Sequence, residues 1–379
     1  MTEPLADVID SMPLIDHHCH GVVSGELDAA GLEALISEGG APAAGMTNFD
    51  APVGLAIRRH CAPLLDLEPH APREAYLARR ADLGGAEATR RLLAGVATSD
   101  FCVDTGHLPD GLSTPEELAA IAGGRAHHIV RLEAVAESVA AAGVEPSEFA
   151  ATYSVALRAA IDEVGAVGVK SIAAYRVGLD LDPTPPEPAA VTAAAARWLS
   201  DSPSPDGRWR LADPVLTRLL LETALDVGLP IQFHVGFGDS DIRMFRVDPT
   251  LLTDWLHRHR VPVMLLHCWP YARQASFLSL IFEHVYLDVG ASTHYVGPTR
   301  AAALLAEALD VTPFSKLLYS SDAFGAPELY TLGALCFRAG LTELFAARVD
   351  AGEWSAADAA RVATMIGRRN AARVYGLAE

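Results

Sequence analysis

The chain has 379 residues, half of them hydrophobic, and a formal net charge of −19, which argues against nucleic acid as a partner because phosphate would be repelled. Its apolar runs fall well short of the roughly 18 residues that span a bilayer, and its polar, acidic N-terminus lacks the basic region of a secretory signal. The five cysteines include no C-x-x-C pair, so we expect a cytoplasmic protein without disulfides or membrane contacts.

After residue 90, short apolar or β-branched runs alternate with longer stretches of helical periodicity. This alternation predicts βα units and a parallel sheet. The predicted strands cover residues 12–18, 99–103, 127–133, 166–173, 229–234, 261–267, 285–289 and 316–322. A count of eight, with about 250 core residues, favours a closed (β/α)8 barrel over an open doubly wound sheet. No G-x-G-x-x-G phosphate loop follows the first strand, which also favours the barrel.

Two segments stand apart from this alternation. Residues 27–93 are interpreted as a mostly helical insertion after the first strand, and residues 180–209 as a proline-rich loop around one short helix. We expect residues 1–379 to form a single barrel domain, closed by two additional helices near 327–349 and 355–374. Loops at a barrel mouth shape the pocket, so both segments are candidates for substrate choice, or for a subunit interface in a homo-oligomer.

Polar residues mark the ends of several predicted strands. The first strand ends in Asp16-x-His18-x-His20, and because alternate side chains of a strand share a face, these three point the same way. Later strands carry or end in Lys170, His234, His267 and Asp322. Each residue alone has an ordinary explanation, as a hydrogen-bonded core histidine or a helix cap. Strand ends converge at one mouth of a barrel, however, so we expect the whole set to meet there.

Imidazoles together with a carboxylate suit Zn²⁺ or another divalent ion such as Mn²⁺. Such an ion lowers the pKa of water from near 16 to about 7, which makes water a nucleophile at neutral pH. Asp322 is then a candidate to accept the proton and pass it to a leaving group. His267 is a candidate to polarise a carbonyl group or to act as a second acid or base.

The pattern Asp16-x-His18-x-His20, with Lys170, His234, His267 and Asp322, resembles the metal-dependent amidohydrolase superfamily. Within it, the chain is most similar to the amidohydrolase-2, or decarboxylase-like, branch. It resembles the amidohydrolase domain that is fused to glutamine-synthetase-like domains in fungi and plants, through segments 169–176, 231–239, 266–273 and 319–328. The resemblance extends over residues 10–375.

The resemblance implies one metal ion, held by His18, His20, His234 and Asp322. In some members of the superfamily a lysine at the position of Lys170 is carboxylated and bridges two ions, so a two-ion site is the alternative. With one ion, we predict that Lys170 stays an ammonium group that faces a substrate anion.

Weaker candidates for substrate binding are Tyr175, Arg176, Trp269 and His294, with Arg131 at the end of the third strand. For each of them, ordinary packing or a structural ion pair is the competing explanation. The function expected is hydrolysis of an amide C–N bond in a small molecule that carries a carboxylate. The alternatives are a decarboxylase acting on a small unsaturated or aromatic acid, and a barrel without catalysis.

Overall fold

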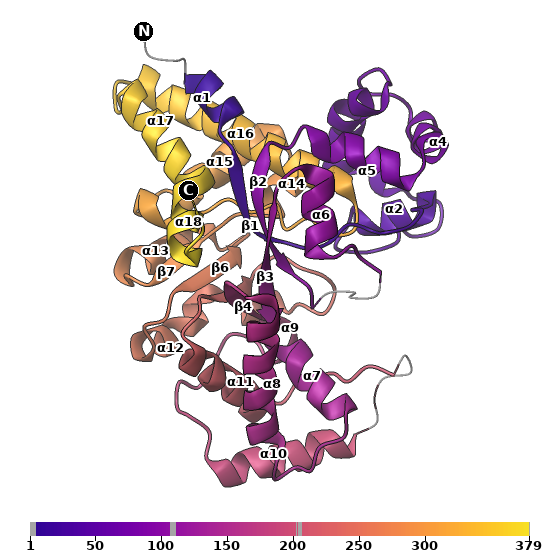
Figure 1. Ribbon diagram of the computed structural model, residues 1–379. Coiled ribbons are helices and arrows are strands. Elements are labelled where there is room, and N and C mark those ends of the chain that lie inside the picture. The colour runs from indigo at the N-terminus through magenta and orange to yellow at the C-terminus, as the bar shows by residue number, and fades with distance from the viewer. Residues whose placement is uncertain (1–4, 107–110, 202, 204–206, 379) are drawn as a thin grey trace.

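The computed structural model describes residues 5–106, 111–201, 203 and 207–378. Within these residues, seven parallel strands form one curled sheet in chain order (Figure 1). The strands are β1 (Leu14–Cys19), β2 (Thr98–Asp104), β3 (Arg125–Arg131), β4 (Gly168–Ser171), β5 (Ile231–Val235), β6 (Val263–His267) and β7 (Val285–Leu287). The predicted α/β architecture with a parallel sheet is therefore confirmed.

The eighth predicted strand, residues 316–322, is not a regular strand, and this part of the prediction was wrong. The segment is extended, and it bonds to β7 through Leu318 N and Leu287 O at 3.0 Å. It also bonds to β1 through Asp322 N and His18 O at 3.0 Å. The backbone at Asp322 is left-handed, with a φ of 50°, which a regular strand does not allow. An irregular segment thus lies where the eighth strand was expected.

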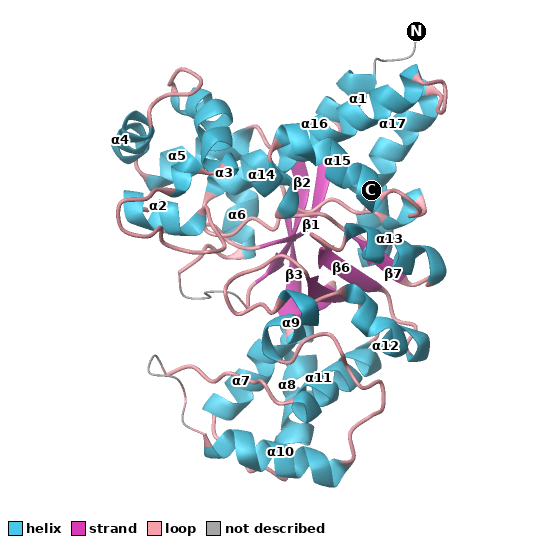
Figure 2. Ribbon diagram, turned by 180° about the vertical axis from the view of Figure 1, so that it is seen from behind, coloured by secondary structure: helices cyan, strands magenta, loops and turns pink. Residues whose placement is uncertain are grey.

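Helices surround the sheet (Figures 1 and 2). Residues 27–93 contain α2 (Ala29–Leu35), α3 (Pro52–Ala56), α4 (Arg73–Leu83) and α5 (Gly85–Ala94), which lie on one side of the sheet. Helices α6 (Pro115–Ala122), α7 (Leu132–Ala141), α8 (Phe149–Val164), α9 (Ala173–Arg176), α10 (Pro188–Ser200), α11 (Pro214–Val227), α12 (Thr253–Arg258), α13 (Ala272–Ile281), α14 (Ser292–Val296) and α15 (Pro298–Ala308) follow the strands. The chain begins with α1 (Leu5–Ser11) and ends with α16 (Pro327–Asp350), α17 (Ala356–Thr364) and α18 (Asn370–Tyr375).

Local sequence signals explain several helix ends. The α11 helix begins where the Asp213 carboxylate accepts bonds from two backbone N–H groups, and it ends at Gly228 with a φ of 78°. The α6 helix was not predicted, although Thr114 and Glu117 form a capping box at its start. The S/T-x-x-E spacing was a usable signal for this helix.

Both faces of the sheet are buried, as expected for parallel strands. Alternate residues fall into two apolar clusters, so that Val263 and Leu265 of β6 pack in an outer cluster against the helices. Met264 and Leu266 pack in an inner cluster with Tyr375 of α18. The C-terminal helix therefore fills the inside of the curled sheet.

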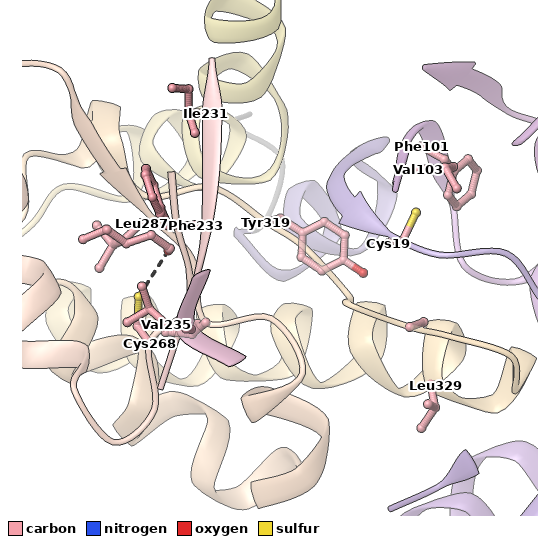
Figure 3. Close-up of a cluster of buried hydrophobic side chains, with 14 of the residues drawn as sticks. Cys19, Phe101, Val103, Ile231, Phe233, Val235, Cys268, Leu287, Tyr319 and Leu329 are labelled. Atoms are coloured by element: carbon pink, nitrogen blue, oxygen red, sulfur yellow. Dashed lines mark hydrogen bonds between the residues drawn. The ribbon is translucent and has the colours of Figure 1, made fainter. Parts of the chain in front are cut away.

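Figure 3 shows part of the outer cluster, with Phe101 and Val103 of β2, Phe233 of β5 and Leu329 of α16. Cys19 belongs to the same cluster, as expected from its alternation away from His18 and His20. Among the described residues, no helix is both long and apolar enough to pass through a membrane.

Candidate metal centre

The ends of β1, β6 and the 316–322 segment bring three side chains together. His18, His267 and Asp322 each offer one ligand atom, and these atoms lie within 4.8 Å of one another. The Nε2 atoms of His18 and His20 are 3.1 and 3.6 Å from Oδ1 of Asp322. The ring of His234 lies 4.6 Å from that of His267, centroid to centroid. The predicted set of histidines and carboxylate therefore meets at one place.

Gln232 determines which nitrogen of His18 carries the proton. Its amide NH₂ group donates to the backbone oxygen of His17 and to the hydroxyl of Tyr375, both at 2.8 Å. Its Oε1 atom must then face Nδ1 of His18, 2.9 Å away, and accept that proton. In the same way, Nδ1 of His20 faces the backbone oxygen of Asp104 at 2.9 Å. The Nε2 lone pairs of both rings are therefore directed at the cluster.

The contact between His18 and Asp322 has the form of a cation site. An unprotonated Nε2 and a carboxylate oxygen are both acceptors, so a contact of 3.1 Å calls for a positive charge beside it. Burial and Lys170 lower the pKa of His18 to about 3, so the imidazole itself stays neutral. Nζ of Lys170, 3.0 Å from the same Nε2, is the positive charge that the chain itself supplies there. Nε2 of His234 is also buried without a hydrogen-bond partner among the described residues. This donor set fits a divalent metal ion.

Strained backbone turns two of these residues toward the cluster. His267 and Asp322 both have positive φ values, 67° and 50°, which cost roughly 1–3 kcal/mol each in residues other than glycine. A buried carboxylate stabilises each turn, because Asp288 accepts a bond from His267 N at 2.7 Å and Asp16 accepts one from Ser321 N at 2.9 Å. Asp16 thus orients Asp322 through its neighbour.

Lys170 lies at the same cluster. Its Nζ atom is 3.0 Å from Nε2 of His18, and the residue is 2% exposed. Burial lowers the pKa of Lys170 to about 8, while Asp104 and Asp322 oppose the shift. An amine with this pKa is compatible with an ammonium that faces an anion and with a neutral amine open to carboxylation. The number of ions therefore stays a prediction.

A cavity of about 230 Å³ opens beside the cluster. Its lining is strongly polar and comprises His20, Glu38, Arg131, Lys170, Ile172, Tyr175, Arg176, Arg210, His234, Asp239, Asp241, Asp322 and Phe324. A cavity of this volume suits a small molecule.

Three of the five weaker candidates for substrate binding, Arg131, Tyr175 and Arg176, line this cavity. Tyr175 packs on His234 with ring centroids 4.3 Å apart, and Arg176 extends from the end of α9. Among the described residues, Trp269 and His294 lie outside the lining. The ring of Trp269 packs against that of Phe237, with centroids 5.8 Å apart, and His294 is buried in α14, where no described residue forms a hydrogen bond with its ring. Roles for these two in binding stay predictions.

Other residues of the site were missed at the level of sequence. Gln232 precedes His234 by two positions on β5, so strand periodicity was a usable signal for it. Arg131, by contrast, was already a weak candidate, and as the register partner of Lys170 it lies at the same end of the sheet. Glu38 lies within residues 27–93, and no local sequence signal predicts that this segment reaches the cavity.

The sequence matches a family model described as amidohydrolase over residues 15–377. Protein fluG of Emericella nidulans is 27% identical over 418 aligned positions, which cover 99% of this chain and 47% of fluG. The chain therefore spans about half the length of this curated relative.

Two solved structures resemble the fold over nearly its whole length. A protein of Lactobacillus casei ATCC 334, provisionally named a metal-dependent hydrolase, is 27% identical, with a TM-score of 0.85 and coverage of 99% of this chain and 98% of that one. The uronate isomerase of Thermotoga maritima is 11% identical, with a TM-score of 0.67 and coverage of 98% and 96%. At 11% identity the second likeness concerns the fold alone.

Proposed function

Because the chain belongs to the amidohydrolase family, we propose that it is a metal-dependent hydrolase that cleaves an amide C–N bond in a small substrate carrying a carboxylate. The observation that carries the proposal is the cluster at the strand ends, where one ligand atom each of His18, His267 and Asp322 lie within 4.8 Å of one another, beside a His234 Nε2 that is buried without a hydrogen-bond partner among the described residues. We assign Zn²⁺ or a similar divalent ion to His18, His20, His234 and Asp322. The likeness to the Lactobacillus casei protein supports a metal-dependent hydrolysis.

The ion, Asp322 and His267 each have a separate role in the proposed hydrolysis. A divalent ion supplies Lewis acidity that lowers the pKa of water to about 7. Asp322 accepts the proton from the attacking water and delivers it to the leaving amine. His267, whose Nδ1 is 3.3 Å from Oδ2 of Asp322, donates to the carbonyl oxygen as negative charge develops there.

The substrate carboxylate has candidate partners among the basic residues of the cavity. Lys170 and Arg176 both line the cavity, and a guanidinium group matches a carboxylate in a bidentate manner. We favour a single ion with Lys170 as an ammonium group. About two equivalents of metal together with a carboxylated lysine would overturn this preference.

The experiment is removal and return of the metal, with product analysis. Purified protein is stripped with a chelator, reconstituted with Zn²⁺ or Mn²⁺, and assayed against γ-glutamyl and other N-acyl amides. We expect amine release that disappears on stripping and returns with about one equivalent of ion. Release of carbon dioxide from unsaturated or aromatic acids, without amine from any amide, would replace the proposal with a decarboxylase.

A matched pair of histidine variants controls for non-specific metal binding. His18→Ala should lose the tightly bound ion, whereas His257→Ala, an exposed histidine of α12, should retain it. Equal metal content in the two variants would remove His18 from the site.

A further inference from the structure

The cavity beside the metal centre has one basic side. Arg131 and Lys170 are register partners on β3 and β4, so their side chains point the same way, and both line the cavity with Arg176. Arg131 is already neutralised, because its guanidinium binds the Asp104 carboxylate at 2.6 and 3.0 Å. Arg176 is less well satisfied. It contacts Glu137 through Nη2 at 3.3 Å, and its buried Nε has no partner among the described residues.

An acidic side of the cavity comes from different parts of the chain. Glu38 lies between α2 and the turn at Asn48–Asp50, and Asp239 follows β5; both line the cavity. Glu38 is partly buried and forms no ion pair within the described part of the chain. Burial, together with the negative charges of Asp322 and Asp239, raises the pKa of Glu38 to about 8. These surroundings therefore hold the Glu38 carboxyl group in its neutral form near pH 7, and a cationic group placed beside it would favour the carboxylate.

The acidic side suits an organic cation. Among the described residues, neither Glu38 nor Asp239 belongs to a group of three metal-ligating side chains whose ligand atoms lie within 4.8 Å of one another. An ammonium group donates up to three hydrogen bonds and needs no closed coordination shell, so carboxyl groups on one wall of a cavity are sufficient to bind it. The cavity therefore offers Arg176 to an anionic group and Glu38 to a cationic group of the same small molecule.

We propose that the cavity takes a zwitterionic substrate, which places a carboxylate against Arg176 and a protonated amine against Glu38. This inference rests on the proposed function, since it names the substrate class of the same site. It narrows that class from a carboxylate-bearing amide to one that also carries an amino group, as derivatives of amino acids do. The Glu38 side recognises the amino group that does not take part in the reaction.

Binding of unreactive probes tests the inference separately from hydrolysis. Calorimetry on the metal-loaded protein compares ω-amino acids, from β-alanine to 6-aminohexanoate, with carboxylic acids of equal length that lack the amine. We expect at least one amino acid to bind about tenfold or more tightly than its matched acid, because one charged hydrogen bond is gained. Equal affinities, or no binding by any probe, would overturn the proposal.

Two variants locate the preference. Glu38→Gln, which keeps the size of the side chain, should reduce the preference for the amine to less than about threefold and leave the plain acids unchanged. Arg176→Gln should weaken amino acids and plain acids alike. Glu145→Gln, an exposed glutamate between α7 and α8, is the control and should behave as wild type. A preference that survives Glu38→Gln would contradict the assignment.

The result separates the two proposals. A Glu38-dependent preference without hydrolysis of any amide would retain the zwitterion site and reject the hydrolase. Amide hydrolysis, together with equal affinities for amino acids and plain acids, would retain the hydrolase and reject the zwitterion site.

Discussion

Gln232 on β5 accepts the Nδ1 proton of His18 on β1 at 2.9 Å, although 214 positions separate them in the chain. The side-chain amide of Gln232 cannot flip to exchange its oxygen and nitrogen, because its NH₂ group donates to the backbone oxygen of His17 and to the Tyr375 hydroxyl. Tyr375 in turn belongs to α18, the last helix of the chain. The C-terminal helix therefore contributes to the orientation of His18, a proposed metal ligand near the N-terminus.

Replacing this acceptor should weaken metal binding. Gln232→Leu removes Oε1, so His18 can place its proton on Nε2 and lose its lone pair toward the ion. We expect metal affinity to fall about 10- to 100-fold, as is typical when such a supporting partner is lost. A competition titration with a chelating dye measures this. Gln274→Leu, on the outside of α13, is the matched control, and equal affinities in the two variants would refute the role of Gln232.

Asp322→Asn should abolish most of the activity. Burial acts to raise the pKa of Asp322, but the neighbouring His267 holds it well below its ordinary value, so the group is a carboxylate at neutral pH. An amide cannot accept the proton, and we expect kcat to fall about 10²- to 10⁴-fold. Asp226→Asn, an exposed residue of α11, controls for the change of charge. Full activity with the metal retained would remove Asp322 from the mechanism.

Gly238→Ala should damage the site by crowding. A methyl group at this position would lie 2.4 Å from the hydroxyl oxygen of Tyr175 and 2.9 Å from Nε2 of His234. We expect both metal affinity and kcat/KM to fall at least about tenfold, since the added group also obstructs a predicted metal ligand. Gly95→Ala, which meets nothing within 4 Å, should leave kcat/KM unchanged.

A second substitution tests the cause. Adding Tyr175→Phe to Gly238→Ala removes the oxygen that lies nearest, and should recover part of the lost metal affinity. No recovery of metal affinity would mean that the contact with His234, rather than with Tyr175, is responsible.

Glu38 should make stability depend on pH. Its pKa is raised from 4.5 to about 8, so between these values the folded protein keeps a proton that the unfolded chain releases. Wild-type stability must then fall as the pH rises through this range. Glu38→Gln has no carboxyl group at this position and does not lose stability in this way. We expect its free energy of unfolding to exceed that of wild type by about 1–3 kcal/mol at pH 9, but by less than about 1 kcal/mol at pH 5. Urea unfolding at both values measures the difference.

The same experiment has a clear contrary outcome. If wild type and Glu38→Gln changed in parallel with pH, the Glu38 carboxyl would not be the group responsible. Glu145→Gln serves again as the exposed control and should follow wild type.

Much of the architecture could be predicted from the pattern of residues. Apolar strands alternate with amphipathic helices, so the parallel sheet and the family followed from sequence alone. The ligand candidates His18, His20, His234 and Asp322 were predictable because each stands at the end of an apolar run, and the ends of parallel strands meet at one edge. The pattern of residues along the chain is sufficient to predict which residues end a strand.

The spacing of residues along the chain does not predict which side chains from distant segments contact a strand end. The irregular backbone at 316–322 depends on Asp16, some 300 residues earlier, which accepts bonds from Ser321. The proton position on His18 depends on Gln232 and Tyr375, and the charge pattern of the cavity depends on Glu38. The sequence alone determined the kind of sheet and the ligand types, since these follow from periodicity. Only the tertiary structure decided the tautomers, the acidic wall and the incomplete eighth strand, because each arises from contacts between segments that are distant along the chain.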